Sequence, residues 1–181
     1  MADKRGFSLQ NRHRAGIRKG MRGRGFLLVL LAFAAPAQAE PRSLGVFGQW
    51  GAFEKAPPRT CYAIAEPYQA PRAQGWKPFA AVAYWPDRKL RGEVHFRLSR
   101  EKRPGSAVLL RIADQTFQLL AGGTDAWAPD RAADAQIVTA MRSGVDMTIE
   151  TRAANGARVR EAYRLAGAAT AIDAAAIACA G

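Results

Sequence analysis

Hydrophobic and polar residues alternate with a period of two over much of residues 44–165, which is the pattern of half-buried β-strands. Several of these runs are rich in Val, Phe, Tyr and Trp, which favour strands. We expect strands over residues 44–53, 60–65, 79–85, 93–98, 107–112 and 116–120. Turn signals separate them at close spacing, so the chain is expected to be mainly β, as an antiparallel sandwich or a barrel-like sheet.

Two further alternating runs predict a hairpin near the C-terminal end. The apolar positions of the first run are Val145, Met147 and Ile149, and one face of the second run holds Val159, Glu161, Tyr163 and Leu165. Asn155 and Gly156 lie between the runs and can form a turn with positive φ.

Two helices are expected beside the strands. Asp130 can cap a helix over residues 131–142, which Gly144 would end. Its apolar face holds Ile137, Val138 and Met141. The spacing of a second set of residues predicts a C-terminal helix with a buried stripe, formed by Leu165, Ala169, Ile172, Ala176 and Cys179.

Residues 21–39 have the basic start, apolar centre and small-residue cleavage site of a secretory signal peptide. The apolar centre is about half of the roughly 20 residues that a membrane anchor needs. A lipid anchor is not expected, because no cysteine follows the cleavage site. Residues 1–20 are either an overlong basic region or precede the true start at Met21, and we favour the second interpretation. A single exported domain is therefore expected over residues 40–181, with no transmembrane span after cleavage.

The charge of +12 for the whole chain is raised by residues 1–39, because residues 40–181 carry 19 Lys or Arg and 14 Asp or Glu. Most of the remaining excess falls within residues 87–103. Cations there could bind lipopolysaccharide phosphates, an acidic host surface or nucleic acid, but solvated strand ends are the simpler interpretation. The candidate interaction surface consists of Arg88, Lys89, Arg91, Arg100, Lys102 and Arg103, together with Trp76.

Tryptophans are the other candidate contact residues. Trp50, Trp85 and Trp127 lie in or beside apolar runs, so we expect them in the core or at its rim. Trp76 lies in a proline-rich segment and is expected to be the most exposed of the four.

Cys61 and Cys179 are the two cysteines of the chain, and no Cys-x-x-Cys motif is present. An even number of cysteines in an exported chain indicates a disulfide rather than metal or redox chemistry. We therefore expect a structural Cys61–Cys179 bond that ties the C-terminal helix back to the strands.

Groups suited to catalysis are sparse. His95 is the only histidine after residue 39, and it falls on the polar face of a strand, so we expect a solvated histidine. A metal site is not expected from one histidine and a disulfide, and no serine lies in a Gly-x-Ser-x-Gly motif. Asp125 with Asp130, or Glu54 with Glu66, could form a glycosidase-type pair, although their spacing also suits ordinary surface carboxylates. We expect no catalytic residue and no cofactor.

Six short segments stand in a characteristic order, and they are GQWGAF at 48–53, RTCYAIAEP at 59–67, DAWA at 125–128, IVTAM at 137–141 with Gly144, YRLAG at 163–167, and the final Ala178-Cys179. Together they resemble the invasion-associated locus B family of exported bacterial proteins, over essentially all of residues 40–181. The resemblance implies a mostly β protein in the periplasm or on the outer surface of a Gram-negative bacterium. It also implies a link to host-cell entry in some pathogens and no established enzymatic activity.

This chain departs from the family pattern in the last hairpin. Family members often have Arg-Gly-Thr at the turn and an aspartate two residues before the tyrosine, whereas this chain has Asn155-Gly156-Ala157 and Glu161. A recognition role of the turn would be lost here. The function expected is an interaction protein with a protein or anionic partner at the envelope or a host surface, and no nucleic-acid partner. The alternatives are a periplasmic hydrolase with a carboxylate pair and an envelope quality-control factor.

Overall fold

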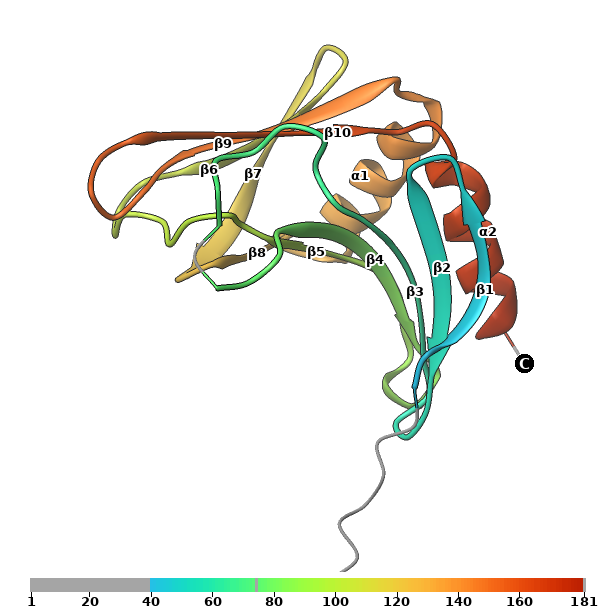
Figure 1. Ribbon diagram of the computed structural model, residues 1–181. Coiled ribbons are helices and arrows are strands. Elements are labelled where there is room, and N and C mark those ends of the chain that lie inside the picture. The colour runs from blue at the N-terminus through green and yellow to red at the C-terminus, as the bar shows by residue number, and fades with distance from the viewer. Residues whose placement is uncertain (1–39, 74, 181) are drawn as a thin grey trace, which may run out of the picture. The chain divides into compact units, whose positions relative to one another are not determined.

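The structure is a computed structural model that describes residues 40–73 and 75–180. The predicted signal peptide (21–39) and residues 1–20 lie outside the described residues. Ten antiparallel strands form one curled half-barrel sheet in the order β1-β2-β3-β4-β5-β8-β7-β6-β9-β10 (Figure 1). The strands are β1 Arg42–Phe47, β2 Trp50–Lys55, β3 Thr60–Ala65, β4 Phe79–Trp85, β5 Leu90–Arg97, β6 Val108–Ile112, β7 Gln115–Gly122, β8 Asp125–Trp127, β9 Asp146–Arg152 and β10 Arg158–Arg164.

The mainly β prediction is confirmed, and the sheet takes the barrel-like form rather than the sandwich. Three helical segments accompany it: the 3₁₀-helix η1 Pro86–Arg88, and the α-helices α1 Arg131–Ser143 and α2 Ala168–Ala178. Helix α2 packs against β1, β2 and β3, while α1 packs against β5, β7 and α2 (Figure 1). No helix in the described part of the chain is long and apolar enough to span a membrane.

The prediction of a single strand over residues 44–53 is wrong. The chain reverses between β1 and β2, because Phe47 pairs with Trp50 and only Gly48 and Gln49 lie between them. Gly48 has φ +58°, a left-handed value that favours glycine, and a Cβ there would lie 2.4 Å from the Ala166 carbonyl oxygen. The close approach to Ala166 therefore requires glycine at this turn.

The hairpin predicted from alternation is confirmed. Strands β9 and β10 pair from Arg152 with Arg158 to Asp146 with Arg164, and Gly156 in the turn has φ +85°. Helix α1 is also confirmed with its cap, since Asp130 Oδ1 accepts the Ala133 amide at 2.8 Å.

The predicted C-terminal helix is present, but its buried stripe is rotated. The residues that α2 buries are Ala168, Ala171, Ile172 and Ala175, whereas Ala169 and Ala176 are only half-buried. The predicted disulfide joins Cys179, immediately after the helix, to Cys61 in β3, with a Cα–Cα distance of 5.8 Å. The bond therefore fixes the end of α2 to the middle of the β1–β5 part of the sheet.

The core lies between the inner face of the sheet and the two helices. Its largest fully buried apolar side chains are Trp50, Phe96, Leu98, Leu110, Ile112, Ile137, Met141, Met147, Ile149, Tyr163 and Ile172. The Trp50 indole Nε1 donates to the Arg164 carbonyl at 2.9 Å, which joins β2 to the far edge strand β10. This contact holds the last hairpin in place.

Candidate functional site

The structure divides the predicted basic surface into two groups at the two ends of strand β5. Arg88, Lys89 and Arg91 lie at its beginning, whereas Arg100, Lys102 and Arg103 follow its end. A strand of this length spans about 25 Å at 3.3 Å per residue, so the two groups do not form one site.

The first group lies beside the disulfide. Lys89 and Arg91 line a hollow of about 190 Å³ together with Tyr84 and Cys179. The Arg88 guanidinium carbon lies 4.8 Å from the centroid of the half-buried Trp85 ring, so part of this group serves packing.

The second group lies against the β9–β10 hairpin through backbone contacts. The Arg103 amide donates to the Arg152 carbonyl at 2.8 Å, and the Ala154 amide donates to the Glu101 carbonyl at 2.9 Å. Lys102 also forms an isolated bridge with Ala153. Residues 98–107 therefore place their cations beside the turn of the hairpin.

The hairpin and its neighbour β6 add cations that the sequence prediction did not include. We call the combined set the hairpin cationic surface, and it consists of Arg100, Lys102, Arg103, Arg111, Arg152, Arg158 and Arg160. Two acidic residues, Glu101 and Glu150, lie among them. The alternating arginines of β10 are a sequence signal that could have indicated this surface, because alternate residues of a strand share a face.

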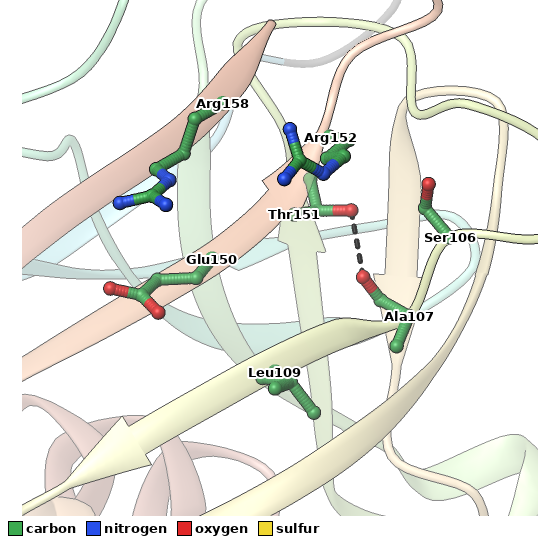
Figure 2. Close-up of a pocket in the computed structure, with 7 residues that line it drawn as sticks. All are labelled: Ser106, Ala107, Leu109, Glu150, Thr151, Arg152 and Arg158. Carbon is green, nitrogen blue, oxygen red and sulfur yellow. Dashed lines mark hydrogen bonds between the residues drawn. The ribbon is translucent and has the colours of Figure 1, made fainter. Parts of the chain in front are cut away.

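A groove of about 400 Å³ opens on this surface (Figure 2). Its lining consists of Ser106, Ala107, Leu109, Glu150, Thr151, Arg152 and Arg158. Glu150 pairs with Arg111 at 3.7 Å and with Arg160 at 3.5 Å, so its charge is largely balanced. The Arg152 Nη1 donates to the Gly156 carbonyl at 3.3 Å, and no carboxylate in the described part of the chain lies within 4.0 Å of the Arg152 guanidinium. Cationic character therefore prevails in the groove.

A second groove, of about 340 Å³, lies at the turn of the hairpin. Its lining consists of Pro71, Arg100, Glu101, Ala153, Ala154, Asn155, Ala157, Arg158 and Val159. Among the described lining residues, Arg158 alone lines both grooves. Within the described part of the chain, neither Arg158 nor Arg100 has a carboxylate within 4.0 Å.

A buried carboxyl positions the cationic segment. Glu161 is fully buried in β10, where its Oε1 accepts the Ser99 amide at 2.5 Å and its Oε2 accepts the Tyr163 hydroxyl at 3.2 Å. Burial raises the pKa of Glu161, although the hydrogen bonds from Ser99 and Tyr163 oppose the rise. Glu161 therefore connects the beginning of segment 98–107 to the hairpin.

Trp76 also contacts segment 98–107. The prediction that it is the most exposed tryptophan is wrong. Its side chain is half-buried, and its Nε1 donates to the Leu98 carbonyl at 2.8 Å. Trp127 is instead exposed to 38% on the outer face of the sheet. Trp50 is fully buried, as expected for the core.

His95 lies on the outer face of the sheet as predicted, but it is not a solvated histidine. Its Nε2 lies 2.8 Å from Asp125 Oδ1, and its ring stacks on Trp127 with centroids 5.2 Å apart. Burial opposes ionisation of Asp125, but hydrogen bonds from His95, Arg97 and Thr124 outweigh it and lower the pKa of Asp125. A lowered pKa is the reverse of what a general acid needs.

The other proposed acids also have separate partners. Asp130 caps α1, Glu54 accepts hydrogen bonds from Arg42 and Arg59, and Glu66 pairs with Lys77 at 2.8 Å. The arginine hydrogen bonds, first Arg42 and then Arg59, lower the pKa of Glu54. Among residues 40–73 and 75–180, no three His, Cys, Asp or Glu residues form a group that could hold a metal ion.

Comparison with known proteins identifies the fold. Neither a scan against models of protein families nor a search of curated proteins gives a match. A search of solved structures finds invasion associated protein B from Bartonella henselae, with a TM-score of 0.50 and 12% sequence identity. The two chains share a fold. The similarity covers 75% of this chain and 94% of the other, and at this identity it supports a fold relationship, as the sequence resemblance implied.

Proposed function

We propose that this protein is an exported binding protein without catalytic activity, related to invasion associated protein B, which binds an anionic partner through the hairpin cationic surface. The signal-peptide pattern and the disulfide support export. The shared fold supports a relationship to invasion associated protein B. The observation that carries the binding role is the concentration of seven cationic residues around two acidic ones beside two grooves.

The arrangement of these charges favours binding over a purely solubilising role. Long-range pairing brings residues 100–103 next to residues 152–154, and β9 in turn pairs with β6 and β10, so the four segments that carry the cations are neighbours. Such a concentration creates a local positive potential that attracts anions and raises their association rate. The partner would be an acidic component of the bacterial envelope or of a host-cell surface, such as phosphate groups of lipopolysaccharide.

The test compares two charge reversals of equal size in the full chain with a C-terminal tag. Arg152→Glu with Arg158→Glu changes the hairpin cationic surface, and Arg88→Glu with Lys89→Glu changes the other end of β5. We expect the first variant to lose about tenfold or more of its affinity for isolated envelope membranes and for host cells, in a salt-dependent manner. The second variant should bind like the wild type.

Equal binding by the wild type and the hairpin variant would reject the proposed function. Equal losses in both variants would also reject it, because the effect would then follow net charge rather than this surface. Cross-linking of the tagged protein in intact cells, followed by mass spectrometry, would identify the partner. A partner recovered with the wild type and lost with the hairpin variant would support the proposal.

One observation favours a second candidate function, the binding of exposed chains of other envelope proteins. Leu120 and Trp127 pair across β7 and β8, and both are exposed on the outer face of the sheet. An apolar contact of this kind suits unfolded polypeptide. Suppression of aggregation of a denatured envelope protein, lost on Trp127→Ser, would support this candidate, whereas no suppression by the wild type would reject it.

A further inference from the structure

The two grooves of the hairpin cationic surface meet at a single side chain. The larger groove lies over β6 and β9, whereas the smaller one lies at the turn between β9 and β10. Arg158 begins β10 and lines both grooves. A ligand long enough to leave one groove would therefore pass Arg158 and enter the other.

The arginines along this path are not balanced by neighbouring acids. Arg152 and Arg158 are directly opposite in the β9–β10 register, and both are exposed. Like charges in this relation destabilise a strand pair, so an anion placed between them would relieve a repulsion. Figure 2 shows the two side chains extending from neighbouring strands on the side where Glu150 lies. Because Glu150 is paired with Arg111 and Arg160, it leaves Arg152 and Arg158 available.

We infer that the two grooves hold consecutive sulfate or phosphate groups of one linear acidic polysaccharide, which crosses β10 at Arg158. This inference rests on the proposed function and adds the class of the partner. Arg152 would hold one anionic group and Arg100 the next, while Arg158 contacts both. Guanidinium groups suit this task, because their planar donors can form paired hydrogen bonds with sulfate and phosphate oxygens.

The lining of the grooves favours a polysaccharide over a nucleic acid. Proteins that bind single-stranded nucleic acid commonly stack bases on aromatic side chains. Neither groove includes an aromatic side chain among its described lining residues. Instead, the Ser106 hydroxyl and the Asn155 amide lie beside the arginines, and such groups can hydrogen-bond sugar hydroxyls.

The volumes and the relative position of the grooves also suit a chain. Both volumes, about 400 and 340 Å³, fall in the range of roughly 300–1,000 Å³ that is typical of ligand sites. The second groove continues from Arg158 to the turn residues Ala153, Ala154 and Asn155, so the two grooves follow one another along the hairpin. A linear polymer can occupy two successive grooves at once.

The test measures fluorescence anisotropy of labelled heparin oligosaccharides, a disaccharide and a decasaccharide, with the full chain. The wild type should bind the decasaccharide about a hundredfold more tightly, since only the long chain reaches both grooves. Arg158→Gln should weaken decasaccharide binding more than Arg152→Gln or Arg100→Gln. The matched control Arg88→Gln should have no effect. Circular dichroism of each variant checks that the substitution leaves the fold intact.

Several outcomes would overturn the inference while the proposed function stands. These are equal affinity for short and long oligosaccharides, equal effects of Arg158→Gln and Arg88→Gln, or binding to anionic phospholipid vesicles but not to heparin. Equally tight binding of single-stranded DNA of the same charge would overturn the assignment to polysaccharide. If the hairpin charge reversal leaves envelope and host-cell binding unchanged, the proposed function fails as well.

Discussion

Removal of the Cys61–Cys179 bond tests how the fold is held together. The bond joins residues 118 positions apart, so it closes most of the described chain into one loop. The loop-entropy model assigns such a closure about 5 kcal/mol at 25 °C, and removal of native disulfides typically costs about 2–5 kcal/mol. We expect Cys61→Ala with Cys179→Ala to lower the free energy of unfolding by an amount in that range.

The loss should affect α2 first, because most of the side chains that it buries are small. Three of the four residues that it buries are alanines, which remove little apolar surface from water. Two polar contacts also hold the helix: Arg59 donates to the Ala178 carbonyl at 2.6 Å, and Arg142 pairs with Asp173 at 2.7 Å. Without the disulfide, α2 should open locally at a lower free energy than the core strands.

Urea denaturation measures the global effect, and hydrogen exchange monitored by mass spectrometry locates it. Thr170→Ala, on the exposed face of α2, serves as the control and should leave both measurements near wild type. A loss below about 1 kcal/mol in the double alanine variant would refute the loop-constraint argument. Exchange in α2 that is as slow as in β3 and β4 would refute the claim that the bond anchors this helix.

Two further predictions concern Glu161 and Gly167. Burial raises the pKa of Glu161 above its ordinary value, so the ionised group costs stability at high pH and the cost disappears as pH falls toward the ordinary value. The urea midpoint of unfolding should therefore be higher for Glu161→Gln than for the wild type at pH 8, and the difference should be smaller at pH 5. An equal difference at both pH values would contradict this reasoning. Gly167→Ala should unfold at a markedly lower temperature in calorimetry, since its Cβ would lie 1.9 Å from the Phe47 carbonyl oxygen and φ is +90°. An unfolding temperature equal to that of the wild type would show that the backbone near Phe47 moves at little cost.

The sequence predicted those elements whose periodicity is long enough to identify. The β9–β10 hairpin has alternating residues on both strands and a turn dipeptide between them, and its inner face is buried as expected. Strand β8 has three residues, too few for an alternation, and it was not predicted. Sequence reasoning misses the turn at Gly48 because apolar residues lie on both sides of it, and the contact that requires glycine comes from Ala166, far along the chain.

The candidate site could be predicted only in part, because it depends on long-range pairing. Arg100, Lys102 and Arg103 were identified from their closeness in sequence, yet the same criterion joined them to Arg88 at the other end of β5. Their neighbours in the structure come from the end of β9 and the turn that follows it, about fifty residues later. The prolines around Trp76 predict exposure, whereas its indole donates a hydrogen bond to the Leu98 carbonyl, at the beginning of the segment that carries the cations.

The arginines of β10 also lie at an open edge of the sheet, and this gives them a second role that can be separated from binding. Tyr68 and Gln69 pair with Ala162 and cover the second half of that edge. The first half, from Arg158, has no neighbouring strand within the described residues, and charged side chains on such an edge prevent pairing between molecules.

Arg158→Glu keeps a charge at the open edge but reverses its sign, whereas Arg158→Val removes the charge and favours strand pairing. We expect the glutamate variant to remain as monomeric as the wild type in sedimentation velocity and to lose heparin binding. The valine variant should lose heparin binding and also self-associate. If the glutamate variant binds heparin like the wild type, edge protection is the remaining role of Arg158. If both variants self-associate to the same extent, charge at this position does not protect the edge.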